Sequence, residues 1–144
     1  MNEKHITRTH ETSEQLSARQ IDGEVVILSL VRFKKIADYS RHPKLDDGTE
    51  ITGREAFQKY MEQVLPLLNR SGSMLFSGEG DGFLIGPPNE KWDWAMLFKQ
   101  HSLSFLMSLE DDPQYRLISG HKEAALEDSR MLPLVEKSEI FPSD

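Results

Sequence analysis

The sequence predicts a single α+β domain built on an antiparallel sheet. The chain has 144 residues, which suits one domain of ordinary size and is too short for two full cores. Short runs rich in β-branched and aromatic residues alternate with segments in which apolar residues recur every three or four positions, the patterns typical of strands and of helices. Two of the strand-like runs, 24–34 and 92–99, carry apolar side chains on both faces. A sheet made of such strands needs cover on both sides.

The chain divides into an arm, a domain and a tail. Residues 1–22 are polar except for a few apolar side chains, so we expect a loose arm with one helical turn around 13–20 that lies outside the core. The folded domain is expected over residues 23–137, and a short tail over 138–144.

The first half of the domain is predicted as strand, loop and helix. The run EVVILSLVRFK is the strand, and residues 34–51 form a long polar connection, expected to be a mobile lid or a docking loop. Thr52 followed by Glu55 is a capping box that begins a helix. Pro66 should kink or weaken the end of this helix, and Gly72 should supply the left-handed residue that terminates it.

The second half is predicted as two strands, two helical segments and a last strand. Residues 73–86 read as a strand broken or bulged at 78–82, and 92–99 as its neighbour. Ser102 should cap a short helix, and Asp112 with Pro113 should begin a second one that runs to about residue 127. The last strand is expected over 130–136, at an edge of the sheet because it contains a proline.

This order of elements is the ferredoxin-like βαββαβ pattern, in which both helices cover the same face of the sheet. The other face of four six-residue strands measures on the order of 400 Å². Covering it is worth on the order of 10 kcal/mol before the costs of association. We therefore expect a homodimer in which two copies stack sheet to sheet.

Composition excludes several classes of function. The chain has no cysteine, so it has no disulfide, no thiolate metal site and no cysteine nucleophile, which fits a reducing cytoplasm. Its net charge of −7 comes with no Lys/Arg cluster, so nucleic acid is not an expected partner. No apolar run is long enough for a signal peptide or a membrane span. We expect no cofactor and no metal, because His121 and Glu123 project about 200° apart around a helix and cannot chelate one ion.

His121 is the candidate catalytic residue, because its spacing from Ile118 and Ala125 places it on the apolar side of the last helix. It is predicted as a general base or a group that orients a ligand. The alternative, a half-buried histidine bonded to a carbonyl, is the more common situation.

The candidate ligand-binding residues are polar or aromatic groups near the apolar faces: Ser29, Arg32, Tyr60, Trp92 and Arg130. Arg32 could hold a carboxylate, the Tyr60 hydroxyl could reach a polar group on a ligand, and Trp92 could line an aromatic pocket. Each also has a structural interpretation. Tyr60 suits core packing, Trp92 and Trp94 suit a dimer interface on one face of their strand, and Asp128 to Arg130 suit a cap with an ion pair.

Four strings resemble the family catalogued as domain of unknown function 1330, within the dimeric α+β-barrel superfamily: LSLVRF, TGREAFQKYMEQVLPLL, LIGPPNEKWDWAMLF and DPQYRLISGHKEAALEDSR. The resemblance covers about residues 24–134 and is most specific in the last string. It implies a ferredoxin-like subunit and a dimer with a small cavity beside its sheet, but no established reaction. The chain departs from the family pattern at Ser29, where relatives carry asparagine, and at Gly120, where they often carry histidine.

Three functions follow as alternatives. The first is a small homodimeric protein that binds a small, partly apolar molecule in a cavity between sheet and helices. The second is a cofactor-independent oxygenase or isomerase in which His121 takes a proton while Arg32 or Tyr60 steadies the anion. The third is a structural interaction module without a pocket. A pocket that holds His121 beside Tyr60 or Arg32 would favour the enzyme, and an apolar face without converging polar groups would favour the module.

Overall fold

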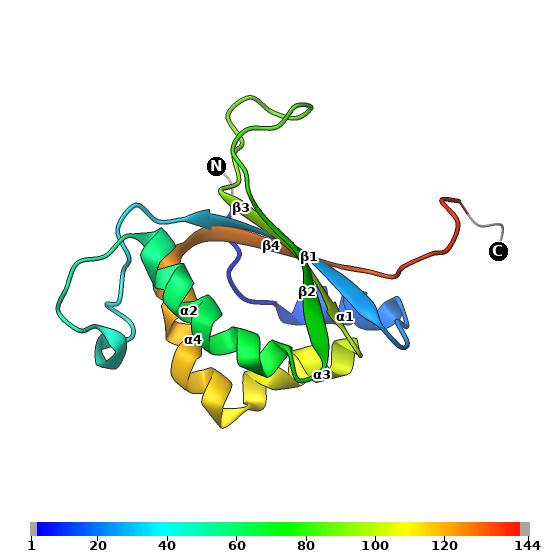
Figure 1. Cartoon of the computed structure of the whole chain (residues 1–144), viewed down its shortest axis with the longest axis horizontal. Coiled ribbons are helices and arrows are strands. Elements are labelled where there is room, and N and C mark those ends of the chain that lie inside the picture. Colours follow the sequence, from blue (N-terminus) through cyan, green and yellow to red (C-terminus); the bar gives the residue numbers. More distant parts are fainter. Residues whose placement is uncertain (1–2, 142–144) are drawn as a thin grey trace.

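Four strands form one antiparallel sheet in the order β2-β3-β1-β4 (Figure 1). The computed structural model describes residues 3–141. The strands are β1 (Val25–Phe33), β2 (Gly72–Glu79), β3 (Trp94–Gln100) and β4 (Leu126–Leu134). All neighbouring strands run antiparallel. This arrangement, with helical connections after β1 and β3, is the ferredoxin-like α+β fold, so the predicted fold class is confirmed.

The helices lie on one side of the sheet (Figure 1). The two main ones, α2 (Gly53–Leu68) and α4 (Pro113–Ala125), pack against each other. The capping box of Thr52 and Glu55 begins α2 as predicted, and the Asp112 side chain accepts hydrogen bonds at the start of α4. The remaining helical pieces are α1 (His10–Ala18), α3 (Leu103–Ser108) and the short 3₁₀ turns η1 (Pro43–Leu45) and η2 (Leu109–Asp111).

Strand register assigns the side chains to two faces. Ile27 lies opposite Phe98, and Val31 lies opposite Trp94, so these four side chains share a face. That face packs on the helices, and the core between them is fully buried; its largest aliphatic members are Ile27, Leu67, Leu126, Val25, Val31 and Val64.

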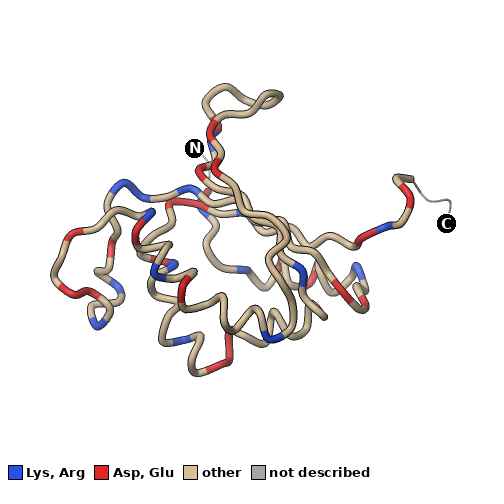
Figure 2. The backbone as a smooth tube through the Cα atoms, in the orientation of Figure 1, with Lys and Arg blue, Asp and Glu red and all other residues tan. Residues whose placement is uncertain are grey.

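Within residues 3–141 no helix covers the opposite face of the sheet, and we call it the open face. Leu28 lies there between Leu97 on β3 and Leu132 on β4. Phe76 and Leu134 extend the apolar surface, and Phe76 and Leu132 remain 57% and 49% exposed. In Figure 2 the strands are mostly free of charged residues, which are interspersed along the loops and helices. The open face is therefore a solvent-exposed apolar surface in the isolated chain.

The connection between β2 and β3 projects from the sheet on the side away from the helices (Figure 1). Its tip, Phe83-Leu84-Ile85, is exposed, with Leu84 at 100% and Ile85 at 91%. We call residues 80–91 the hairpin arm. Its exposed apolar tip adds to the surface that the open face presents.

Several predicted boundaries differ from the structure. Asn69, in the right-handed helical region, caps α2, and Gly72 instead begins β2. The break predicted at 78–82 is present, because β2 ends at Glu79 and pairing resumes only as a single bridge between Gly82 and Lys91. A register shift between Met74 and Phe76 was not predicted. The last helix ends at Ala125, and β4 starts at Leu126, four residues earlier than expected, because its pairing with β1 already begins there. Its position at the edge of the sheet is as predicted.

The N-terminal arm differs from the loose segment that its polarity predicted. The helix α1 spans nine residues, and Ile6 and Ile21 pack against the core. The backbone of His5 is tied to β4, since its N–H donates to Asp128 at 2.8 Å and its carbonyl accepts from the Ser129 hydroxyl at 2.5 Å. The arm thus covers the free edge of β4, where unpaired polar groups would otherwise be exposed.

No helix within residues 3–141 is long and apolar enough to cross a membrane.

Candidate functional site

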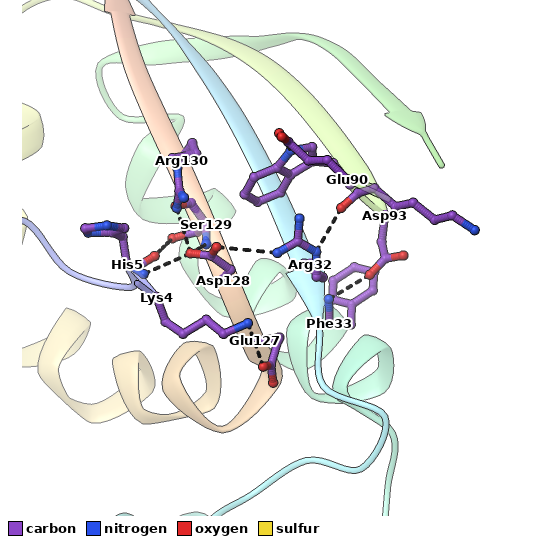
Figure 3. Close-up of polar contacts among 12 residues, drawn as sticks. Lys4, His5, Arg32, Phe33, Glu90, Asp93, Glu127, Asp128, Ser129 and Arg130 are labelled. Atoms are coloured by element: carbon purple, nitrogen blue, oxygen red, sulfur yellow. Dashed lines mark hydrogen bonds and ion pairs between the residues drawn. The ribbon is translucent and has the colours of Figure 1, made fainter. Parts of the chain in front are cut away.

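Three of the predicted ligand-binding residues meet at one end of the open face. Figure 3 shows two of them, Arg32 and Arg130, on either side of Asp128. Arg32 comes from the end of β1, Arg130 from β4, and Trp92 from the turn just before β3. The guanidinium carbon of Arg32 lies 4.3 Å from the centre of the Trp92 ring, and that of Arg130 lies 5.3 Å from it. Both distances suit a cation on an aromatic face. Two cations thus share one buried indole ring, and we call this group the Arg–Trp cluster.

Asp128 holds the two arginines together. Its carboxylate, 1% exposed, accepts from Nη1 of Arg130 at 2.7 Å and from Nη1 of Arg32 at 3.4 Å (Figure 3). Burial by itself raises the pKa of Asp128, but hydrogen bonds from the His5 N–H, the Arg130 side chain and the Ser129 N–H together outweigh burial and lower it. Asp128 is therefore a carboxylate at neutral pH, and the predicted ion pair with Arg130 is present.

Trp92 lies outside the strand in which it was predicted. The carboxylate of Asp93 accepts from the N–H of Phe33 at 2.8 Å, and the backbone N–H of Asp93 donates to Val31. This irregular pairing turns Trp92 toward the arginines on the open face. Trp94 faces the helices, near Arg54 of α2. The two tryptophans therefore do not share a face as the alternation had suggested.

His121 belongs to a second cluster, on the helix side of the molecule. Its Nδ1 and the Tyr39 hydroxyl are hydrogen-bonded at 2.7 Å, and both side chains are buried. Burial lowers the pKa of His121, and the charges of Lys59 and His42 lower it further. The ring is therefore neutral at pH 7 and has the protonation state of a base.

His42 joins this cluster from the loop that follows β1. Its Nε2 pairs with the Glu123 carboxylate on α4. Gly120 makes this approach possible, because a Cβ there would lie 2.7 Å from the His42 ring and from Leu45. The loop 34–51 is thus docked on α4. It borders a shallow hollow of about 250 Å³ next to Tyr39.

The remaining predicted residues stand apart from both clusters. The Tyr60 hydroxyl is hydrogen-bonded to that of Tyr115 at 3.1 Å. Burial is the main cause that raises the pKa of Tyr60 well above its usual range, and the neighbouring Tyr115 raises it further. Ser29 is buried on the helix side of the sheet. Neither Tyr60 nor Arg32 lies beside His121 in the way the enzyme hypothesis required.

The sequence did not single out Tyr39, His42 or Glu123 as members of one site. Their proximity depends on how the 18-residue stretch from Lys34 to Ile51 folds back, which no periodic pattern encodes. Within the described residues no group of three histidine, aspartate or glutamate side chains is placed to hold a metal ion. A second hollow, of about 330 Å³, lies between α1 and α3 and contains none of the predicted residues.

The neutral state of His121 predicts a pH dependence of stability. The unfolded chain binds more protons than the folded one as the pH falls below about 6.5, so the folded state loses stability there. In His121→Gln this part of the loss should vanish. Urea unfolding midpoints at pH 7.5 and 5.5 measure it: the wild-type midpoint should fall more than that of the variant. An equal fall in both proteins would show that His121 does not titrate as its surroundings indicate.

Comparison with solved structures places the chain among known proteins. RPA0582 from Rhodopseudomonas palustris, a protein of unknown function, is 31% identical over 95% of this chain and 100% of its own, with a TM-score of 0.81. The methylated form of RPA0582 gives 32% identity over 94% and 98% of the two chains, with a TM-score of 0.79. The chain belongs to the RPA0582 family.

More distant structures share the fold of the RPA0582 family. A dimeric ferredoxin-like protein of unknown function from Jannaschia sp. CCS1 is 9% identical over 79% of this chain and 100% of its own, with a TM-score of 0.50. The protein At3g17210 from Arabidopsis thaliana is 13% identical over 81% and 99%, with a TM-score of 0.52. No protein-family model and no curated protein matches the chain. Its function must therefore be argued from the two clusters.

Proposed function

We propose that the chain forms a homodimer through the open face of its sheet and binds a small, partly apolar molecule there. The observation that carries the proposal is a solvent-exposed apolar sheet face that ends in the Arg–Trp cluster. Apolar surface of this extent is rarely left exposed on a monomer. The Jannaschia protein with this fold is described as dimeric, which supports the assembly.

The size of the interface supports a role for the hairpin arm. A standard interface buries about 800 Å² on each partner. The flat footprint of four short strands supplies about 400 Å². The tip at Phe83, Leu84 and Ile85 is exposed apolar surface on the same side of the molecule, and an aromatic residue alone buries about 150–250 Å². Sheet face and hairpin arm together reach the size that a stable dimer needs.

We propose that the ligand binds on the open face and not, as the sequence predicts, between sheet and helices. Core side chains such as Ile27, Val64 and Leu67 fill the space between those two layers. Three of the candidate residues converge instead on the other side of the sheet. A second copy stacked there would enclose the ligand in a cavity beside the sheet.

The enzyme hypothesis keeps one observation in its favour. His121 is a buried, neutral imidazole in contact with a hydroxyl, as a general base requires. Its partner is Tyr39, however, and the arginines lie across the sheet. The interaction module is disfavoured because polar groups do converge on the apolar face. Binding is therefore the better supported function.

The hairpin arm offers the first test of the assembly. The double variant Leu84→Ser with Ile85→Ser should leave the stability of the subunit within about 0.5 kcal/mol, because both side chains are exposed in the isolated chain. It should weaken the dimer by at least about 100-fold, since burying each such side chain is worth about 1.5–3 kcal/mol. Sedimentation velocity over a concentration series measures both species.

Leu117→Ser is the matched control, because Leu117 is an exposed leucine on α4, away from the open face. It should leave the dimer unchanged. A wild-type chain that sediments at 16.5 kDa throughout the micromolar range would overturn the dimer. A thermal-shift screen of a metabolite mixture against the wild-type protein tests ligand binding separately.

Two finer assignments are part of the same proposal. The resemblance of four strings to the family catalogued as domain of unknown function 1330 supports membership of that family, and the absence of cysteine supports a cytoplasmic location.

A further inference from the structure

The Arg–Trp cluster has more donors than its own acceptors use. Asp128 supplies one negative charge to two guanidinium groups. Nε of Arg32 donates to the carbonyl of Lys91 at 2.8 Å, and Nη1 of Arg130 also donates to the carbonyl of Ser129 at 2.7 Å. Among the described residues, no hydrogen bond uses Nη2 of Arg32, or Nε and Nη2 of Arg130.

Two other carboxylates, in the turn before β3, are already engaged. Glu90 accepts from the Trp92 indole N–H at 3.0 Å, and Asp93 from the N–H of Phe33. Both arginine side chains still reach solvent, with 26% exposed for Arg32 and 43% for Arg130. The cluster is therefore accessible to an external acceptor while its arginines are held in place by Asp128 and the Trp92 ring.

The surroundings of the free donors are apolar. Arg130 lies opposite Leu30 on β1, which in turn lies opposite Ala95 on β3, and Leu28 and Leu132 follow along the open face. A molecule that places an anionic group on the guanidiniums would lay its other end on these side chains. Guanidinium groups suit planar anions, because their parallel N–H donors match the two oxygens of a carboxylate.

We propose that Arg32 and Arg130, stacked on Trp92, bind the carboxylate of a small aromatic or aliphatic acid whose apolar part lies along the open face. The inference rests on the proposed function and specifies the chemical class of its ligand. A carboxylate is preferred over phosphate because one negative charge balances the second guanidinium, and the adjoining leucines favour an apolar body over a strongly hydrated dianion.

Trp92 provides the readout. The chain has two tryptophans, so Trp94→Phe leaves Trp92 as the sole indole reporter. In this background, benzoate should change the tryptophan emission in a saturable way. Benzyl alcohol, its neutral analogue, and inorganic phosphate should each bind at least about tenfold more weakly, because they lack the charge or the apolar ring.

Variants of the cluster assign the effect. Arg130→Gln should weaken benzoate binding at least about tenfold. Arg130→Lys should have the same effect, because lysine keeps the positive charge that pairs with Asp128 but lacks the two parallel N–H donors of the guanidinium. If Arg130→Gln does not fold, the affinity of Arg130→Lys for benzoate tests the inference. Arg54→Gln is the matched control, since Arg54 also stacks on an aromatic ring, Phe33, but lies on the helix side. It should leave the affinity unchanged.

Three results would overturn the inference: no saturable response to benzoate, equal affinity in wild type and Arg130→Lys, or phosphate binding as tight as benzoate. Sedimentation of the same samples separates this from the assembly. If the protein is a dimer that does not bind benzoate, the proposed ligand class is wrong and the proposed dimer stands. If Arg130→Gln also weakens that dimer, the guanidinium pairs with an acid of the second copy, and the ligand site is likewise overturned. A monomer that binds benzoate contradicts the dimer alone.

Discussion

Replacing Leu132 by glutamate is expected to convert the dimer into folded monomers. Leu132 lies on β4 opposite Leu28, in the open face, and is half exposed in the isolated chain. A carboxylate there reaches water in the monomer and costs little. In the dimer it would be buried without a partner, at a cost of several kcal/mol for each copy. Two such charges at about 3 kcal/mol each raise the dissociation constant by about 10⁴-fold.

The matched control is Leu117→Glu. Leu117 is 72% exposed on α4, so the same substitution adds the same charge to the helix side. Sedimentation equilibrium should give a monomer for Leu132→Glu and a dimer for Leu117→Glu, with the circular dichroism of both unchanged. If Leu117→Glu dissociates the dimer and Leu132→Glu does not, the subunits meet through their helices.

Asp128→Ala is expected to be the most destabilising single change in the polar part of the molecule. It removes a buried carboxylate that accepts from Arg130, from Arg32 and from the backbone N–H of His5. Loss of one partner from a buried charged network costs about 3–5 kcal/mol. Because both arginines can turn toward water, we expect about 3 kcal/mol, near the lower end.

The pH dependence of this loss has a definite sign. The folded-state pKa of Asp128 lies below its unfolded value, so its contribution is present above about pH 4 and is lost as the pH falls through the folded pKa. The difference between wild type and Asp128→Ala should therefore shrink at acid pH. In Asp128→Ala the N-terminal arm, which His5 ties to Asp128, should also detach from β4. Trypsin should then cleave the peptide bond after Arg8.

Asp111→Ala is the control for Asp128→Ala. Asp111 pairs with Arg116 on the surface, at 3.3 Å and with most of its side chain in solvent, so its removal should cost less than about 1 kcal/mol. Urea unfolding at pH 7 compares the two. Similar losses of unfolding free energy in Asp128→Ala and Asp111→Ala would show that the buried contacts of Asp128 contribute no more than a surface ion pair.

Much of the fold followed from local patterns. A run rich in β-branched residues and leucine predicted β1. The Thr52–Glu55 and Asp112-Pro113 signals predicted the starts of α2 and α4, because caps depend on neighbours a few residues away. The β4 start was missed since Leu126 and Ala125 suit either structure, and pairing with a distant strand decided between them.

The site was predictable in its components and not in its assembly. The sequence predicts Arg32, Trp92 and Arg130 separately, each from the chemistry of its own side chain. They meet because β1 pairs with β4 and because the backbone at Asp93 turns Trp92 to the open face. The docking of His5 on Asp128 joins residues 123 positions apart, which no short-range pattern encodes. His42 reaches Glu123 through the same kind of long-range contact.

Hydroxyl-radical footprinting at rising protein concentration tests most directly whether the open face is covered by a second copy. The labelling of Phe76, Leu132 and Leu84, all exposed in the isolated chain, should fall together as the dimer forms, while Leu117 stays labelled throughout. Constant labelling of Phe76 and Leu132 at concentrations where the protein sediments as a dimer would contradict the account, because the copies would then meet through another surface.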